Sequence, residues 1–62
     1  MMTRPYTEDD RNAVRFALTR AGFDPDLCEV KEAVLISTTG EETVIVHVPV
    51  VGGSTAPINV SL

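Results

Sequence analysis

The chain has few of the features that staple a small protein together. It has 62 residues, with one cysteine, one histidine and no tryptophan. A lone thiol cannot form an internal disulfide, and a single His with a single Cys does not provide the paired ligands of a structural zinc site. We therefore expect no disulfide, no metal and no other cofactor. A chain of this size then depends on its own core or on association with another subunit.

Charge is scarce at one end of the chain. The formal net charge is −4, and no charged side chain follows Glu42. An acidic chain is a poor ligand for nucleic acid, which is bound through Lys and Arg. The longest apolar run, 44–51, is far shorter than the roughly 20 residues of a membrane-spanning helix, and the polar N-terminal region lacks the apolar segment of a secretory signal. We expect a cytoplasmic protein without a membrane segment.

Residues 8–21 are predicted to form a helix. Thr7 is a good N-cap, and the acidic residues after it suit the positive end of a helix. One apolar stripe repeats at helical spacing and comprises Val14, Ala17, Leu18 and Ala21. Gly22 suits the left-handed position that ends a helix. Phe16 lies almost opposite this stripe on the helical wheel, so the same core cannot bury it.

Two β-branched segments within residues 29–51 predict a β-hairpin, and residues 58–62 predict a short third strand. A register in which Thr38 lies opposite Glu42 places alternate side chains of the hairpin on two opposite faces of the sheet. The face expected under the helix holds Val30, Val34, Ile36, Val44, Val46, Val48 and Val50, with Glu32 as the misfit. The other face holds Lys31, Ala33, Leu35, Ser37, Thr43, Ile45, His47, Pro49 and Val51. The prediction is a single α+β domain in the order α-β-β-β, with the helix on one face of a small antiparallel sheet.

No group of residues predicts catalysis. His47 is the only histidine, the residue type that most often serves as a general base, but its expected neighbours include no carboxylate and no nucleophile. Cys28 follows acidic residues and lacks a cationic neighbour, so we interpret it as a small, half-buried apolar residue. The acidic segment 24–29 lacks the ligand order of a calcium loop, and the glycine-rich segment 52–54 is followed by no Lys and opens no helix. We expect no enzyme activity and no catalytic, metal or cofactor-binding residue.

The second face of the sheet predicts a partner interface. An antiparallel sheet of a monomer normally turns a polar face to water, whereas this face has few charges and an apolar centre. Two subunits related by a two-fold axis would bury it, through the face or through the last strand. The expected interface residues are Phe16, Leu35, Ile45, His47, Val51, Ile58 and Val60. Arg11 and Arg15, four residues apart on the helix, are the candidate polar contacts for a carboxylate, a phosphate or an acidic partner.

The opening Thr3-Arg4-Pro5-Tyr6-Thr7-Glu8-Asp9-Asp10, which leads straight into the helix, resembles the openings of small uncharacterised accessory proteins of actinobacterial phages. The resemblance covers only this segment and carries no site residues. It implies a compact protein that binds another protein or assembles, in the host cytoplasm or in a virion.

Three hypotheses about function follow from these observations. The first is a non-enzymatic, homo-oligomeric interaction protein, including one that binds a host protein. The second is a decoration or cement subunit of a virion, whose uncharged C-terminal segment adds strands to a neighbour. The third is a nucleic-acid-related regulator, which the negative charge disfavours, or a nucleic-acid mimic, for which nine carboxylates in 62 residues are not an extreme number.

Overall fold

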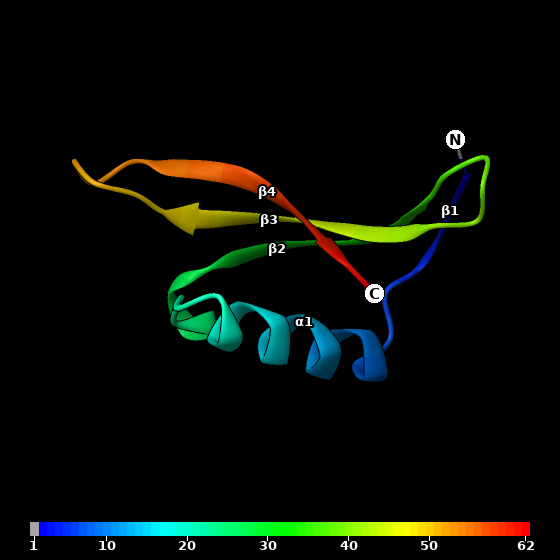
Figure 1. Cartoon of the computed structure of the whole chain (residues 1–62), viewed down its shortest axis with the longest axis horizontal. Coiled ribbons are helices and arrows are strands. Elements are labelled where there is room, and N and C mark those ends of the chain that lie inside the picture. Colours follow the sequence, from blue (N-terminus) through cyan, green and yellow to red (C-terminus); the bar gives the residue numbers. More distant parts are fainter. Residues whose placement is uncertain (1) are drawn as a thin grey trace.

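One α-helix packs on one face of a four-stranded antiparallel sheet, which confirms the predicted α+β class (Figure 1). The computed structural model describes residues 2–62. The elements along the chain are β1 (Met2–Pro5), α1 (Glu8–Arg20), the short 3-10 helix η1 (Pro25–Leu27), β2 (Glu29–Ile36), β3 (Glu42–Pro49) and β4 (Thr55–Ser61). The strands lie in the order β1-β2-β3-β4, so each strand neighbours the next one in the sequence.

The first strand was not predicted, and the order of elements is β-α-β-β-β rather than α-β-β-β. β1 pairs with only the last half of β2, from Ala33 to Ile36. The sequence MTRP has neither an apolar alternation nor a run of β-branched residues, so its extended form depends on pairing with a distant segment. β4 also begins three residues before the expected position 58, because Pro57 lies inside the strand.

The helix begins and ends as its sequence predicts. The Asp10 N–H donates to Thr7 Oγ1 at 3.2 Å, and the Thr7 N–H donates to the Asp10 carboxylate at 2.8 Å, which completes a capping box. At the other end the Phe23 N–H donates to the Leu18 carbonyl at 2.9 Å, and Gly22 adopts a φ of +91°. A residue with a side chain is strained at that φ, so Gly22 fixes where the helix stops.

The core contains the apolar stripe of the helix and one face of the sheet. Its fully buried members are Val14, Leu18, Val34, Val44, Val46 and Val48, with Val60 nearly buried beside them. The predicted assignment of side chains to faces is therefore right for the inner valines of β2 and β3. Val50 is an exception: it lies past the end of β3 and is 41% exposed.

The register of the hairpin differs from the predicted one by two residues. Ile36, rather than Thr38, lies opposite Glu42. A shift of two residues keeps every side chain on its face, which is why the core was still found. The register shifts again between Val30 and Val34, and the misfit Glu32 falls in this irregular stretch and is exposed. Between the pairs that Val30 and Val34 make with β3, β2 has two more residues than β3, and because this number is even, the Val30 side chain stays on the helix side of the sheet.

Hydrogen bonding fixes which backbone groups of β4 face the outer edge of the sheet. The Leu62 N–H donates to the Glu42 carbonyl and the Val50 N–H donates to the Ser54 carbonyl, both at 3.0 Å. In an antiparallel ladder the bonded pairs alternate, so the even-numbered residues of β4 bond to β3 and the odd-numbered ones face outward. Pro57 is at an outward position, where its missing N–H leaves no donor for another strand.

The same alternation holds at β1. The Ser37 N–H donates to the Glu41 carbonyl at 2.9 Å, so odd-numbered residues join β3 to this end of β2 and Val34 bonds instead to β1. Arg4 is the partner of Val34, and Pro5 beside it faces outward. Both outer strands thus have a proline at a position whose N–H would otherwise point away from the sheet.

Candidate functional site

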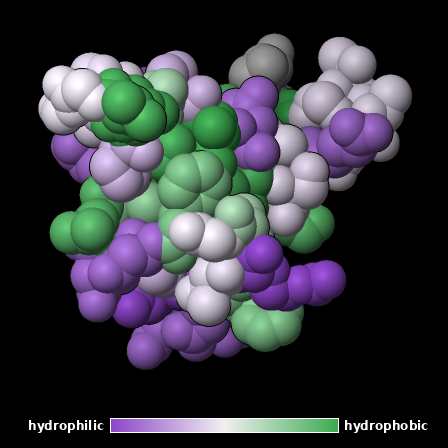
Figure 2. All heavy atoms as spheres, turned by 60° about the vertical axis from the view of Figure 1, so that its left-hand side comes forward, coloured by the Kyte–Doolittle hydropathy of each residue, from purple (hydrophilic) through white to green (hydrophobic). Residues whose placement is uncertain are grey.

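The face of the sheet opposite α1 has no covering layer within residues 2–62. Register places its side chains in rows across the strands: Thr3, Leu35, Thr43 and Ser61; Pro5 with Ala33; Ile45 with Asn59; Glu29, His47 and Pro57; and Pro49 with Thr55. Among these paired residues only Glu29 is charged. Figure 2 views the molecule from one end, where apolar residues gather at the level of the sheet and hydrophilic residues surround the helix below it. The rows named above form one surface on the far side of the sheet from α1. We call this surface the open face.

The structure brings three of the predicted interface residues together. Leu35, Ile45 and His47 lie on the open face and are half-buried by their neighbours. Phe16 does not join them: it is 64% exposed on the outer side of α1, with the Arg20 guanidinium 5.7 Å from its ring centre. The helix separates Phe16 from the sheet, so the prediction of one surface that includes both is wrong.

The other predicted interface residues also lie elsewhere. Val51 is fully exposed in the turn between β3 and β4. Ile58 and Val60 belong to the helix side of β4, where Val60 is 7% exposed in the core and Ile58 packs against it. Val60 thus belongs to the core of the subunit, and Ile58 is half-buried on the helix side, away from the open face. The sequence could not fix this because it left the pairing of the last strand undecided.

His47 has different neighbours from those expected. It lies opposite Glu29 on β2 and opposite Pro57 on β4. The irregular register of β2 causes this difference, since the extra residues bring Glu29 to a position where a regular strand would place Lys31. A carboxylate is thus opposite His47 in register, but neither cross-strand partner has a hydroxyl or thiol that His47 could activate.

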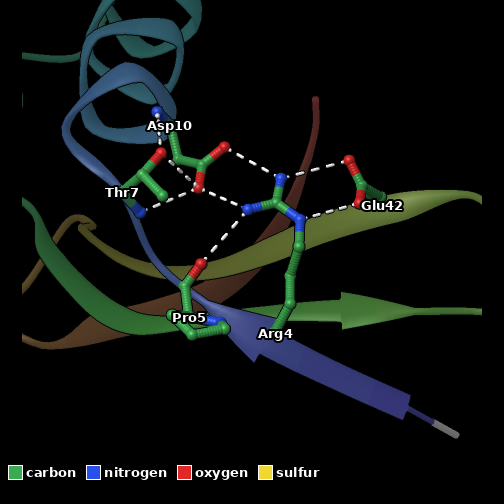
Figure 3. A network of polar contacts seen from close by, with 5 residues as sticks. All are labelled: Arg4, Pro5, Thr7, Asp10 and Glu42. Carbon is green, nitrogen blue, oxygen red and sulfur yellow. Dashed lines mark hydrogen bonds and ion pairs between the residues drawn. The ribbon is translucent and has the colours of Figure 1, made fainter.

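A network around Arg4 was missed by the sequence interpretation (Figure 3). The Arg4 guanidinium donates to both carboxylate oxygens of Asp10, at 2.7 and 2.9 Å, and to both of Glu42, at 2.7 and 3.1 Å. Hydrogen bonds from Arg4 hold the pKa of both carboxyl groups below their usual range, with the Thr7 N–H also contributing at Asp10. The same bonds raise the pKa of Arg4. All four carboxylate oxygens are occupied, so this network joins β1, α1 and β3 rather than offering a free acid or base.

A groove of about 440 Å³ lies between α1, η1 and β2. Arg11 and Arg15, the predicted polar contacts, both line it, and Arg15 Nη2 donates to Asp26 Oδ1 at 2.9 Å. Cys28 is half-buried in the wall, where burial raises the pKa of its thiol. This agrees with the predicted unreactive cysteine.

Tyr6 is one of the residues that line this groove. Its hydroxyl is buried and has no hydrogen-bond partner among the described residues. Burial raises the pKa of Tyr6, and the negative charge of Glu32 raises it further. No sequence signal marked Tyr6, because its environment depends on where the chain leaves β1 to enter α1.

Within residues 2–62 no group of three or more His, Cys, Asp or Glu side chains is placed to hold a metal ion. None of the helices in this part of the chain has the length and apolar character needed to cross a bilayer. Comparison with protein-family models, with curated proteins and with solved structures found no match for this chain. A function therefore has to be inferred from the geometry of the chain itself.

Proposed function

We propose that this chain is a non-enzymatic interaction protein that pairs with a second copy of itself through the open face. The observation that carries the proposal is the open face, which has an apolar centre at Leu35 and Ile45 and one charged residue among its paired positions. Such a face is unusual for a sheet whose other side is already covered by a helix.

The distribution of charge favours a second copy as the occupant. Each subunit has a net charge of −4, so two copies repel each other least where they meet over few charges. Among the paired residues of the open face only Glu29 is charged, whereas the helix side contains most of the acidic and basic residues. A charged partner would instead require complementary charges across the contact.

The area of the contact also favours a whole face over a single strand edge. A standard interface buries about 800 Å² on each partner. That is roughly a fifth of the 4438 Å² accessible surface of this subunit. Figure 1 looks down the shortest of the 35 × 20 × 16 Å extents and shows the sheet above the helix, so the open face spans the longest and the shortest axes and is needed as a whole to supply such an area. Two sheets stacked through their open faces would form a sandwich with about 10 Å between the sheets.

Ile45→Glu tests this proposal because it places a carboxylate at the centre of the open face. Val51→Glu is the matched control, since it adds the same charge at a fully exposed turn position. Sedimentation equilibrium at high micromolar protein should give a dimer for the native chain and for Val51→Glu. Ile45→Glu should give a folded monomer, with an unchanged circular dichroism spectrum. A monomeric native chain, or a dimer that Ile45→Glu leaves intact, would overturn the proposal.

Other roles inferred from the sequence are supported less well. A virion subunit that donates its last strand would use the outer edge of β4, where Pro57 removes a donor. An accessory role directed at a host protein needs a surface other than the paired open faces. The groove beside α1 is such a surface.

A further inference from the structure

The edge of β2 is only partly covered. β1 pairs with Ala33 to Ile36, and the chain then turns away at Tyr6 to enter α1. The first half of β2, Glu29–Glu32, therefore has no strand beside it on that side among the described residues. This uncovered half borders the groove, which its side chains help to line.

Val30 presents its backbone to this open edge. It lies opposite Val46, and the even-numbered residues of β3 bond to β4, as the bond from Leu62 to Glu42 shows. The pair of Val30 and Val46 is thus of the type that exchanges no hydrogen bonds. The Val30 N–H and C=O consequently point away from β3, into the open edge.

The three exposed strand edges of the sheet differ in whether their outward N–H groups can pair with an added strand. Pro5 on β1 and Pro57 on β4 each remove an outward N–H, which discourages strand addition at both outer strands. No proline interrupts the uncovered half of β2, and its N–H and C=O at Val30 remain free to pair. Among residues 2–62 this half is also the one strand edge that borders the groove along the helix.

The groove determines what kind of strand could bind there. A residue paired with Val30 would point its side chain to the helix side, onto a floor that includes Leu18 and Tyr6. On the helix side the groove is lined by Asp26, Glu32, Arg11 and Arg15, and Arg15 is already paired with Asp26. Glu32 and Arg11 balance each other, and the net charge of −4 on the chain disfavours an acidic segment, so a neutral or basic segment fits the groove better.

We propose that the uncovered edge of β2 binds an extended, neutral-to-basic peptide segment of a partner protein by strand addition, with a β-branched side chain seated opposite Val30. Backbone hydrogen bonds would supply affinity, and the groove beside α1 would select alternate side chains. The site lies on the helix side of the sheet. Pairing of two subunits through the open face leaves it accessible.

The test is a titration of the isotope-labelled native protein with three blocked pentapeptides, followed by amide NMR. The basic probe is acetyl-Lys-Val-Lys-Val-Lys-amide, the acidic one replaces each Lys by Glu, and the third is the basic probe N-methylated at both valines. The basic probe should shift the Val30 amide and slow its hydrogen exchange about tenfold or more. The acidic and N-methylated probes should bind at least about tenfold more weakly, which corresponds to about 1.4 kcal/mol.

A pair of variants separates the backbone from the side chain. Val30→Pro removes the outward N–H, whereas Val30→Ala removes the same side-chain contacts and keeps the N–H. Val30→Pro should bind the basic probe about tenfold more weakly than Val30→Ala does. Equal binding by the two variants, equal binding of the basic and N-methylated probes, or shifts centred on Ile45 instead of Val30 would overturn the proposal. If Val30→Pro does not fold, the N-methylated probe decides the question with the native protein.

Discussion

Replacement of Tyr6 by Phe should stabilise this protein. The Tyr6 ring packs against the core, but its hydroxyl is buried without a partner among the described residues. An unpaired buried polar group costs about 1–3 kcal/mol of folding free energy. Phe keeps the ring contacts and removes the orphan hydroxyl, so we expect a gain of about 1 kcal/mol, or a rise of about 4–8 °C in Tm for a domain of this size.

Urea denaturation followed by circular dichroism measures this gain. Both proteins must be compared at the same concentration, because association of subunits adds to apparent stability. Tyr6→Leu is the control: it also removes the hydroxyl but loses the ring, so it should be less stable than Tyr6→Phe. Equal or lower stability of Tyr6→Phe relative to the native chain would refute the reasoning, since it would mean that the hydroxyl is hydrogen-bonded in solution.

The pH dependence gives a second check on the same residue. In the unfolded chain Tyr6 loses its proton near pH 10, whereas burial raises its pKa in the folded protein. The unfolded chain therefore releases this proton first, and the free energy of unfolding of the native protein, constant with respect to Tyr6 below about pH 10, falls as the pH rises toward the folded-state pKa of Tyr6. The advantage of Tyr6→Phe should widen in this range. Tyr6 is the only tyrosine and there is no tryptophan, so its phenolate absorbance can be followed directly.

Two further predictions concern the Arg4 network and the helix. Asp10→Asn should lower stability at neutral pH and weaken its dependence on acid. Hydrogen bonds depress the pKa of Asp10 in the folded state, so the stability that its carboxylate contributes is present above about pH 4 and is lost as the pH falls toward the folded-state pKa. Urea midpoints of the native chain and of Asp10→Asn that differ by nothing between about pH 3 and 7 would contradict this. Leu18→Ala should cost about 2–5 kcal/mol, because Leu18 is fully buried. Phe16→Ala should cost less than about 1 kcal/mol, since it loses only exposed contacts with Arg20; similar losses in thermal melts of the two variants would mean that Phe16 is covered in solution.

Local signals in the sequence predicted the parts of the fold that depend on neighbouring residues. The helix was found because Thr7 caps it, Gly22 ends it and Val14 and Leu18 repeat at the right spacing. The two faces of the hairpin were found because alternation survives a register error of two residues. The helical spacing of Arg11 and Arg15 likewise predicted that they would lie together, as they do in the groove.

The missed features all depend on contacts between distant segments. β1 is short and polar, and only its pairing with β2 and the bonds of Arg4 to Glu42 show why it is extended. The side on which Val60 lies depends on the register of β4 against β3, which no turn motif specified. The sequence predicted one surface for Phe16 and the second face of the sheet because neither had an expected covering layer. In the structure Phe16 lies on the outer side of α1, and α1 packs on the opposite face of the sheet.

The pairing of β1 has a kinetic consequence for the binding edge. β2, β3 and β4 form two hairpins between segments that are near in sequence, whereas β1 must reach β2 across the whole helix. Long-range pairings form late in folding, because the loop-closure entropy has to be met before their contacts form. β1 is therefore expected to pair last, and the bonds from Arg4 to Asp10 and Glu42 then hold it in place. Until β1 has paired, the free edge of β2 runs along its entire length rather than along its first half alone.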